Sequence, residues 1–128
     1  MALNSSTDYP TIELGGRTLV VRFSFAAQIL LKRRYGIDPS KLKEALEPTN
    51  PDHGENLIKL FASMVAENFV DVDKPEAVVL TNTPTSDYWL TQVDHETIKA
   101  IDEVVSVSMG KAREAAKRAA TSPIPIAS

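Results

Sequence analysis

The sequence predicts a mostly helical α+β fold: an N-terminal β-hairpin packed on a small helical bundle, with a long C-terminal helix. Three observations predict it. A Gly-Gly pair separates two short apolar segments, the middle of the chain repeats apolar residues at helical spacing, and a capping Asp94 precedes a longer apolar stripe. The 128 residues fit one domain, placed at 10–120 between a flexible N-terminus at 1–9 and a disordered tail at 121–128.

The hairpin is expected within residues 10–23. Residues 11–14 alternate polar with apolar side chains, and Gly15-Gly16 can supply the positive φ angles of a tight turn. The second strand is then expected to place one face inward, carrying Leu19, Val21 and Phe23. A lone hairpin is marginal in water, so this face must pack on helices.

A first helix is expected from Phe25 to about Tyr35, capped by Ser24 and ended by Gly36 in the left-handed conformation. Its apolar side is predicted to hold Phe25, Ile29 and Leu30. The last turn carries Lys32-Arg33-Arg34, because cations suit the negative end of the helix dipole. Asp38-Pro39 then starts a short helix whose apolar side is formed by Leu42 and Leu46.

The middle of the chain is expected to hold a central helix at 55–70, after a turn-rich loop at 47–54. Its stripe comprises Leu57, Ile58, Phe61, Met64, Val65, Asn68 and Phe69. Residues 75–81 read equally well as a helix or as a strand. After a loop at 82–87, Tyr88-Trp89-Leu90 is expected to anchor a helical turn on the core, and Tyr88-Trp89 is alternatively a binding hot spot.

The long C-terminal helix is expected to begin after Asp94 and to change character at Gly110. Its stripe continues through Ile98, Ile101, Val105, Met109, Ala112, Ala116 and Ala119. After Gly110 the stripe is Ala only, and Ala buries little area. The segment 111–120 therefore suits contact with another helix, while a solvated helix is the alternative.

Charge is distributed unevenly along the chain, whose net charge is −3. The charged residues of 17–34 are all Lys or Arg, those of 61–110 are mostly Asp or Glu, and those of 111–128 are again mostly Lys or Arg. Such polarity suits head-to-tail self-association or docking on charged partners. An ordinary solvated surface with intramolecular pairing is the alternative.

Composition argues against most catalytic chemistry. The chain has no Cys, which excludes disulfides, thiolate zinc sites and Cys nucleophiles. His95-Glu96 lacks a second His four residues on, and the spacing of Asp71, Asp73 and Glu76 is not that of an EF-hand loop. We therefore expect no enzyme activity, no cofactor, no metal and no membrane span, and the acidic balance disfavours nucleic acid.

The order of the N-terminal elements resembles a known family. A glycine-turned hairpin, Thr11 to Phe23, leads into a helix that ends in Tyr35-Gly36 and then a small helix that ends at Leu46. This looks like the front half of the tail assembly chaperones of long-tailed, siphovirus-like bacteriophages, and the similarity covers roughly residues 10–70. The resemblance implies a non-enzymatic protein that oligomerises.

Such a chaperone would bind the tape measure protein and help to recruit tail tube subunits. The resemblance places it in the host cell cytoplasm during assembly and not in the finished virion. Candidate partner contacts are the two basic clusters and the Ala-rich stripe, comprising Lys32, Arg33, Arg34, Lys111, Arg113, Ala116, Lys117 and Arg118. Two alternatives remain open: a structural virion subunit of the tail or head–tail connector, and a small nucleic-acid-binding regulator that uses residues 111–118.

Overall fold

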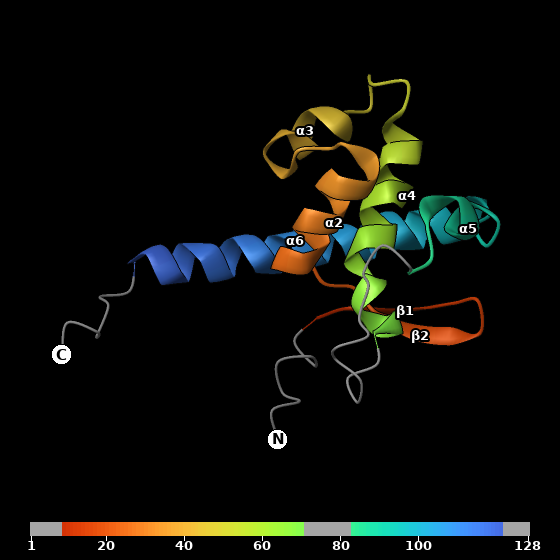
Figure 1. Ribbon diagram of the computed structural model, residues 1–128, viewed down its shortest axis with the longest axis horizontal. Helices are drawn as coiled ribbons and strands as arrows, with labels where there is room; N and C mark the ends of the chain where they lie inside the picture. Colours follow the sequence, from red (N-terminus) through yellow and green to blue (C-terminus); the bar gives the residue numbers. More distant parts are fainter. Residues whose placement is uncertain (1–8, 71–82, 122–128) are drawn as a thin grey trace.

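The computed structural model describes residues 9–70 and 83–121, and the first of these form the predicted hairpin (Figure 1). Strand β1 (Thr11–Leu14) pairs antiparallel with β2 (Arg17–Val20). Gly15 and Gly16 make the turn with φ angles of 62° and 78°. The second strand ends at Val20, earlier than predicted. The Val21 amide still donates to the Pro10 carbonyl at 3.0 Å, but Pro10 has no N–H with which to continue the ladder.

Helix α2 (Phe25–Tyr35) begins and ends as predicted. The Ala27 amide donates to Ser24 Oγ at 3.1 Å, and Gly36 ends the helix with a φ of 69°. The predicted apolar side is correct for Leu30, which is buried, and wrong for Phe25, which is 77% exposed; Ile29 is half-buried, and Ala27 and Leu31 complete the buried set. Apolar residues occur on most sides of this helix, so the face that packs on its neighbours cannot be recognised by spacing.

Two short helical segments follow: a 3-10 helix (η1, Pro39–Lys41) and α3 (Leu42–Ala45). The Ser40 amide donates to the Asp38 carboxylate at 2.9 Å, which confirms the predicted cap. Leu42 is buried and Leu46 is half-buried, and both pack on the core.

Helix α4 (His53–Met64) forms the centre of the bundle and contacts α2, α5 and α6. It starts inside the predicted loop 47–54, and a separate 3-10 helix (η2, Ala66–Phe69) replaces the last turn of the predicted helix. The predicted stripe is confirmed at Leu57, Ile58, Phe61, Met64 and Val65, which are buried, whereas its last two members, Asn68 and Phe69, are half-buried and lie in η2.

Helix α5 (Ser86–Leu90) carries Trp89, which is 1% exposed and therefore belongs to the core. Its ring meets Phe61 edge-on, with 5.5 Å between ring centroids. The helix starts at Ser86, inside the predicted loop 82–87. Residues 1–8, 71–82 and 122–128, including the segment 75–81 that read as helix or strand, lie outside the described residues.

Helix α6 (His95–Thr121) crosses the bundle and extends well beyond it at its C-terminal end (Figure 1). The Thr97 amide donates to the Asp94 carboxylate at 2.8 Å, as expected for a cap. Ile101 and Val105 are buried, and the helix is tied to the hairpin by a bond of 2.8 Å from Ser108 Oγ to the Val21 carbonyl. Thr121, predicted as the first residue of the tail, is instead the last residue of α6, and residues 122–128 lie outside the described residues.

At Val20, the outer edge of β2 is held by the side chain of Asn68. Asn68 Oδ1 accepts from the Val20 amide at 3.0 Å, while Asn68 Nδ2 donates to the carbonyls of Val20 at 2.8 Å and Val65 at 2.9 Å. The carboxamide therefore satisfies both backbone groups that Val20 would otherwise present to a third strand.

Candidate protein-binding surface

The basic cluster at the end of α2 divides into exposed and structural residues. Lys32 and Arg33 are exposed at the surface. Arg34 is half-buried, and its guanidinium donates to the carbonyls of Pro84 at 3.1 Å and Thr83 at 3.0 Å. Arg34 thus joins α2 to the segment that enters α5, so its first role is structural, which its place in the basic run did not indicate.

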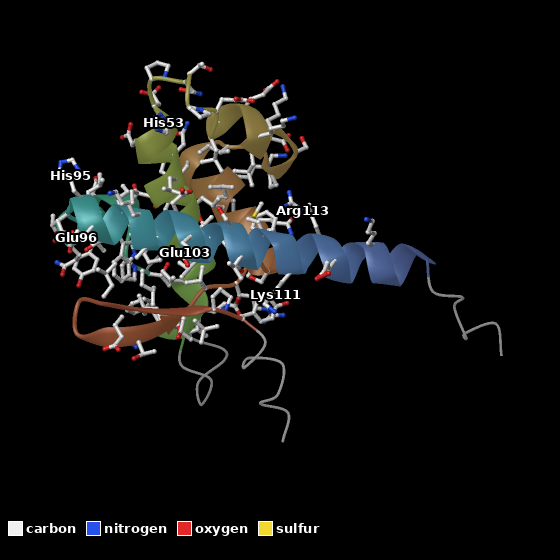
Figure 2. The ribbon with its side chains drawn as sticks, turned by 180° about the vertical axis from the view of Figure 1, so that it is seen from behind. His53, His95, Glu96, Glu103, Lys111 and Arg113 are labelled. Carbon is white, nitrogen blue, oxygen red and sulfur yellow. The ribbon has the colours of Figure 1, made fainter. Side chains whose placement is uncertain are left out.

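The basic residues of α6 point to different sides of the helix. Figure 2 shows Arg113 and Lys111 on opposite edges of α6, and Lys111, Arg113 and Lys117 are all exposed. Only Arg113 of these borders the groove described next. The side chains of Ala116 and Arg118 lie outside the described residues, so the Ala-rich stripe is followed only as far as Ala112, which is half-buried.

An apolar groove lies between α3, the start of α4 and the middle of α6. Its volume is about 490 Å³, and its apolar lining comprises Leu42, Leu46, Leu57, Val105 and Met109. Its polar lining comprises Lys43, His53, Asp102, Ser106 and Arg113. Leu46 and Met109 are half-buried, so part of their apolar surface is open to a partner.

Four large apolar side chains are also exposed elsewhere on the described surface: Phe25, Tyr88, Leu90 and Val107. Phe25 is the most exposed, at 77%, although sequence spacing assigned it to the core side of α2. The one local indication that Phe25 would be exposed is its position next to the Ser24 cap, because a residue in the first helical turn has fewer neighbours from the body of the domain.

The residues weighed for metal or acid–base chemistry are solvated. His53 and His95 are exposed, and His53 Nδ1 lies 3.0 Å from the Asn50 carbonyl oxygen. Asp102 and Glu103 are exposed on α6, while Asp71, Asp73 and Glu76 lie outside the described residues. Within 9–70 and 83–121, no three His, Asp or Glu side chains gather closely enough to hold a metal ion.

Two carboxylates have lowered pKa values for a structural reason. The Ser40 amide lowers the pKa of Asp38, and the Thr97 amide lowers the pKa of Asp94, because each N–H donates to the ionised carboxylate. Both residues are helix caps, so these shifts reflect helix initiation and not catalysis.

We compared the chain with protein-family models, with curated proteins and with solved structures, and none of the three comparisons found a match. No helix within the described ranges is both long and apolar enough to cross a membrane. The groove and the exposed basic residues beside it are therefore the features from which a function can be inferred.

Proposed function

We propose that this protein is a non-enzymatic chaperone of phage tail assembly that binds the tape measure protein and helps to recruit tail tube subunits. The observation that carries the proposal is the apolar groove between α3, α4 and α6. A groove with an apolar floor and a charged rim suits the apolar side of an amphipathic helix. The resemblance of residues 10–70 to tail assembly chaperones supports the same class of client.

The charges of the rim indicate which helix would fit. Lys43 and Arg113 are exposed at the edges of the groove, against a single carboxylate from Asp102. A client helix with acidic residues beside its apolar stripe would complement the two cations, because opposite charges across an interface favour the encounter and fix its register. We therefore assign the groove to an acidic amphipathic segment of the tape measure protein.

Co-expression with tape measure fragments tests this assignment. The parent chain should keep acidic amphipathic fragments in the soluble fraction, and the variant Lys43→Glu/Arg113→Glu should bind them roughly tenfold more weakly, equivalent to about 1.4 kcal/mol. Lys41→Glu is the matched control, because Lys41 is exposed two residues before Lys43 and does not line the groove. Fragments that pellet equally with and without the parent chain would remove the main support.

The proposed chaperone acts in the host cell cytoplasm and leaves before the virion is complete. Mass spectrometry of purified particles separates this from the structural alternative. Only trace amounts of the chain are expected in particles, whereas abundant copies would indicate a subunit of the tail or of the head–tail connector.

A further inference from the structure

Helix α6 has an outer face that points away from the bundle. It lies opposite the buried residues Ile101 and Val105, and α6 crosses in front of the other elements when the molecule is seen from behind (Figure 2). Val107 lies at the middle of this face and is 46% exposed. Together with Gly110 and Lys111 it lines a shallow depression in the surface.

Charges on the outer face are arranged with opposite signs on the two sides of Val107. Glu103 lies four residues before Val107, and Lys111 lies four residues after it. Farther from Val107, Glu96 on one side corresponds to Lys117 on the other, and Lys99 corresponds to Glu114. In each pair the two distances from Val107 agree within one residue, and the two charges are opposite. All six of these charged residues are exposed.

Three of these charged side chains are available to a partner. Within the part of the chain that the structure describes, the side chains of Glu96, Glu103 and Lys111 form no hydrogen bond and no ion pair. The sign-reversed order means that a second α6 laid antiparallel over the first would place Glu103 of each copy against Lys111 of the other. A parallel arrangement would instead place like charges together.

Gly110 gives a second, independent observation. Glycine is a poor residue for the interior of a helix. The fold of the single chain does not require it, since Gly110 has no positive φ and an added Cβ would meet nothing within 4 Å. A missing side chain on an outer face lets another helix approach closely, near the short end of the usual interaxial distance of about 8–10 Å.

We propose that two copies of this chain pair antiparallel through the outer faces of α6, about a twofold axis at Val107. The axis places Val107 against its own counterpart and brings Glu103 to Lys111 twice, as a closed twofold interface requires. The groove that was assigned to a client lies on a different side of α6, so the pairing does not depend on the proposed function.

Charge exchange on the full chain tests the pairing. Glu103→Lys alone and Lys111→Glu alone should each raise the dimer dissociation constant roughly tenfold or more, measured by sedimentation equilibrium. The double variant Glu103→Lys/Lys111→Glu should restore dimerisation, because the exchanged charges meet across the axis again. Glu47→Lys, an exposed change outside α6, is the matched control and should leave the equilibrium unchanged.

Single cysteines test the orientation, since the chain has none of its own. Val107→Cys should form a disulfide-linked dimer under mild oxidation. Glu103→Cys should not link to itself, because the antiparallel register separates the two copies by about 12 Å along the axis, beyond the roughly 7 Å that a disulfide spans. An equal mixture of Glu103→Cys and Lys111→Cys chains should give the mixed dimer.

Three results would overturn the proposal. These are a chain that stays monomeric at the highest soluble concentration, a double variant that dimerises no better than the single variants, and a Glu103→Cys chain that links to itself faster than Val107→Cys. Circular dichroism of each variant shows whether the helices are intact, which separates a lost interface from a lost fold.

Discussion

Replacing Asn68 with Ala tests how the hairpin is attached to the helices. The variant loses the three bonds that the carboxamide makes to Val20 and Val65. At about 1 kcal/mol net for each bond, we expect the free energy of unfolding to fall by about 3 kcal/mol. For a chain of this length the melting temperature should fall by roughly 10 °C.

Urea denaturation followed by circular dichroism measures this loss. Asn56→Ala is the matched control, because Asn56 is also half-buried and its side chain donates once, to the Ala45 carbonyl at 2.9 Å. The control should lose about 1 kcal/mol. Equal losses in the two variants, or a loss below about 0.5 kcal/mol for Asn68→Ala, would refute the conclusion that this carboxamide holds the edge of β2.

Three further predictions concern single residues. Arg34→Met keeps the aliphatic stem but loses the bonds to Thr83 and Pro84, so it should cost about 2 kcal/mol in urea denaturation and speed limited proteolysis before α5. The Thr97 amide lowers the pKa of Asp94 below its ordinary value of 3.8, so this cap stabilises the fold above that pH and less as pH falls through the lowered value. Asp94→Ala should therefore melt below the parent near neutral pH, and the difference should narrow in thermal scans as the pH falls below 3.8; a constant difference would argue against the cap. Gly110→Ala should raise the stability of the dilute monomer by about 1 kcal/mol, since the added Cβ meets nothing within 4 Å, and a lower melting temperature would contradict this.

The parts of the fold that local chemistry decides were predicted from the sequence. The caps at Ser24, Asp38 and Asp94, the helix end at Gly36 and the turn at Gly15-Gly16 depend on residues within a few positions of one another. Five residues of the α4 stripe were also predicted correctly, but burial extends beyond that stripe to Leu60, Ala62 and Ser63, because α4 is surrounded by other elements.

The side of α2 that packs inward could not be predicted in the same way. Phe25, Ile29, Leu30 and Leu31 surround the helix, so spacing alone favours no single face. Burial of Leu31 rather than Phe25 is decided by contact with α4, which lies more than twenty residues farther along the chain.

The candidate site was predicted as two basic clusters and an Ala-rich stripe, and not as a groove. The exposed Lys32, Arg33, Lys111 and Arg113 are surface residues as expected, but nothing in the run of bases set Arg34 apart as a structural residue. The groove requires α3, α4 and α6 to meet, and this meeting depends on long-range packing that no local pattern records.

The bond from Ser108 to Val21 joins residues 87 positions apart, which has a consequence for synthesis on the ribosome. The hairpin emerges first, but its contact with α6 cannot form until Ser108 has left the exit tunnel. During that interval the buried side of the hairpin lacks this cover. Nascent chains that end before Ser108 should therefore be bound by general chaperones, and their release should coincide with the docking of α6 on the hairpin.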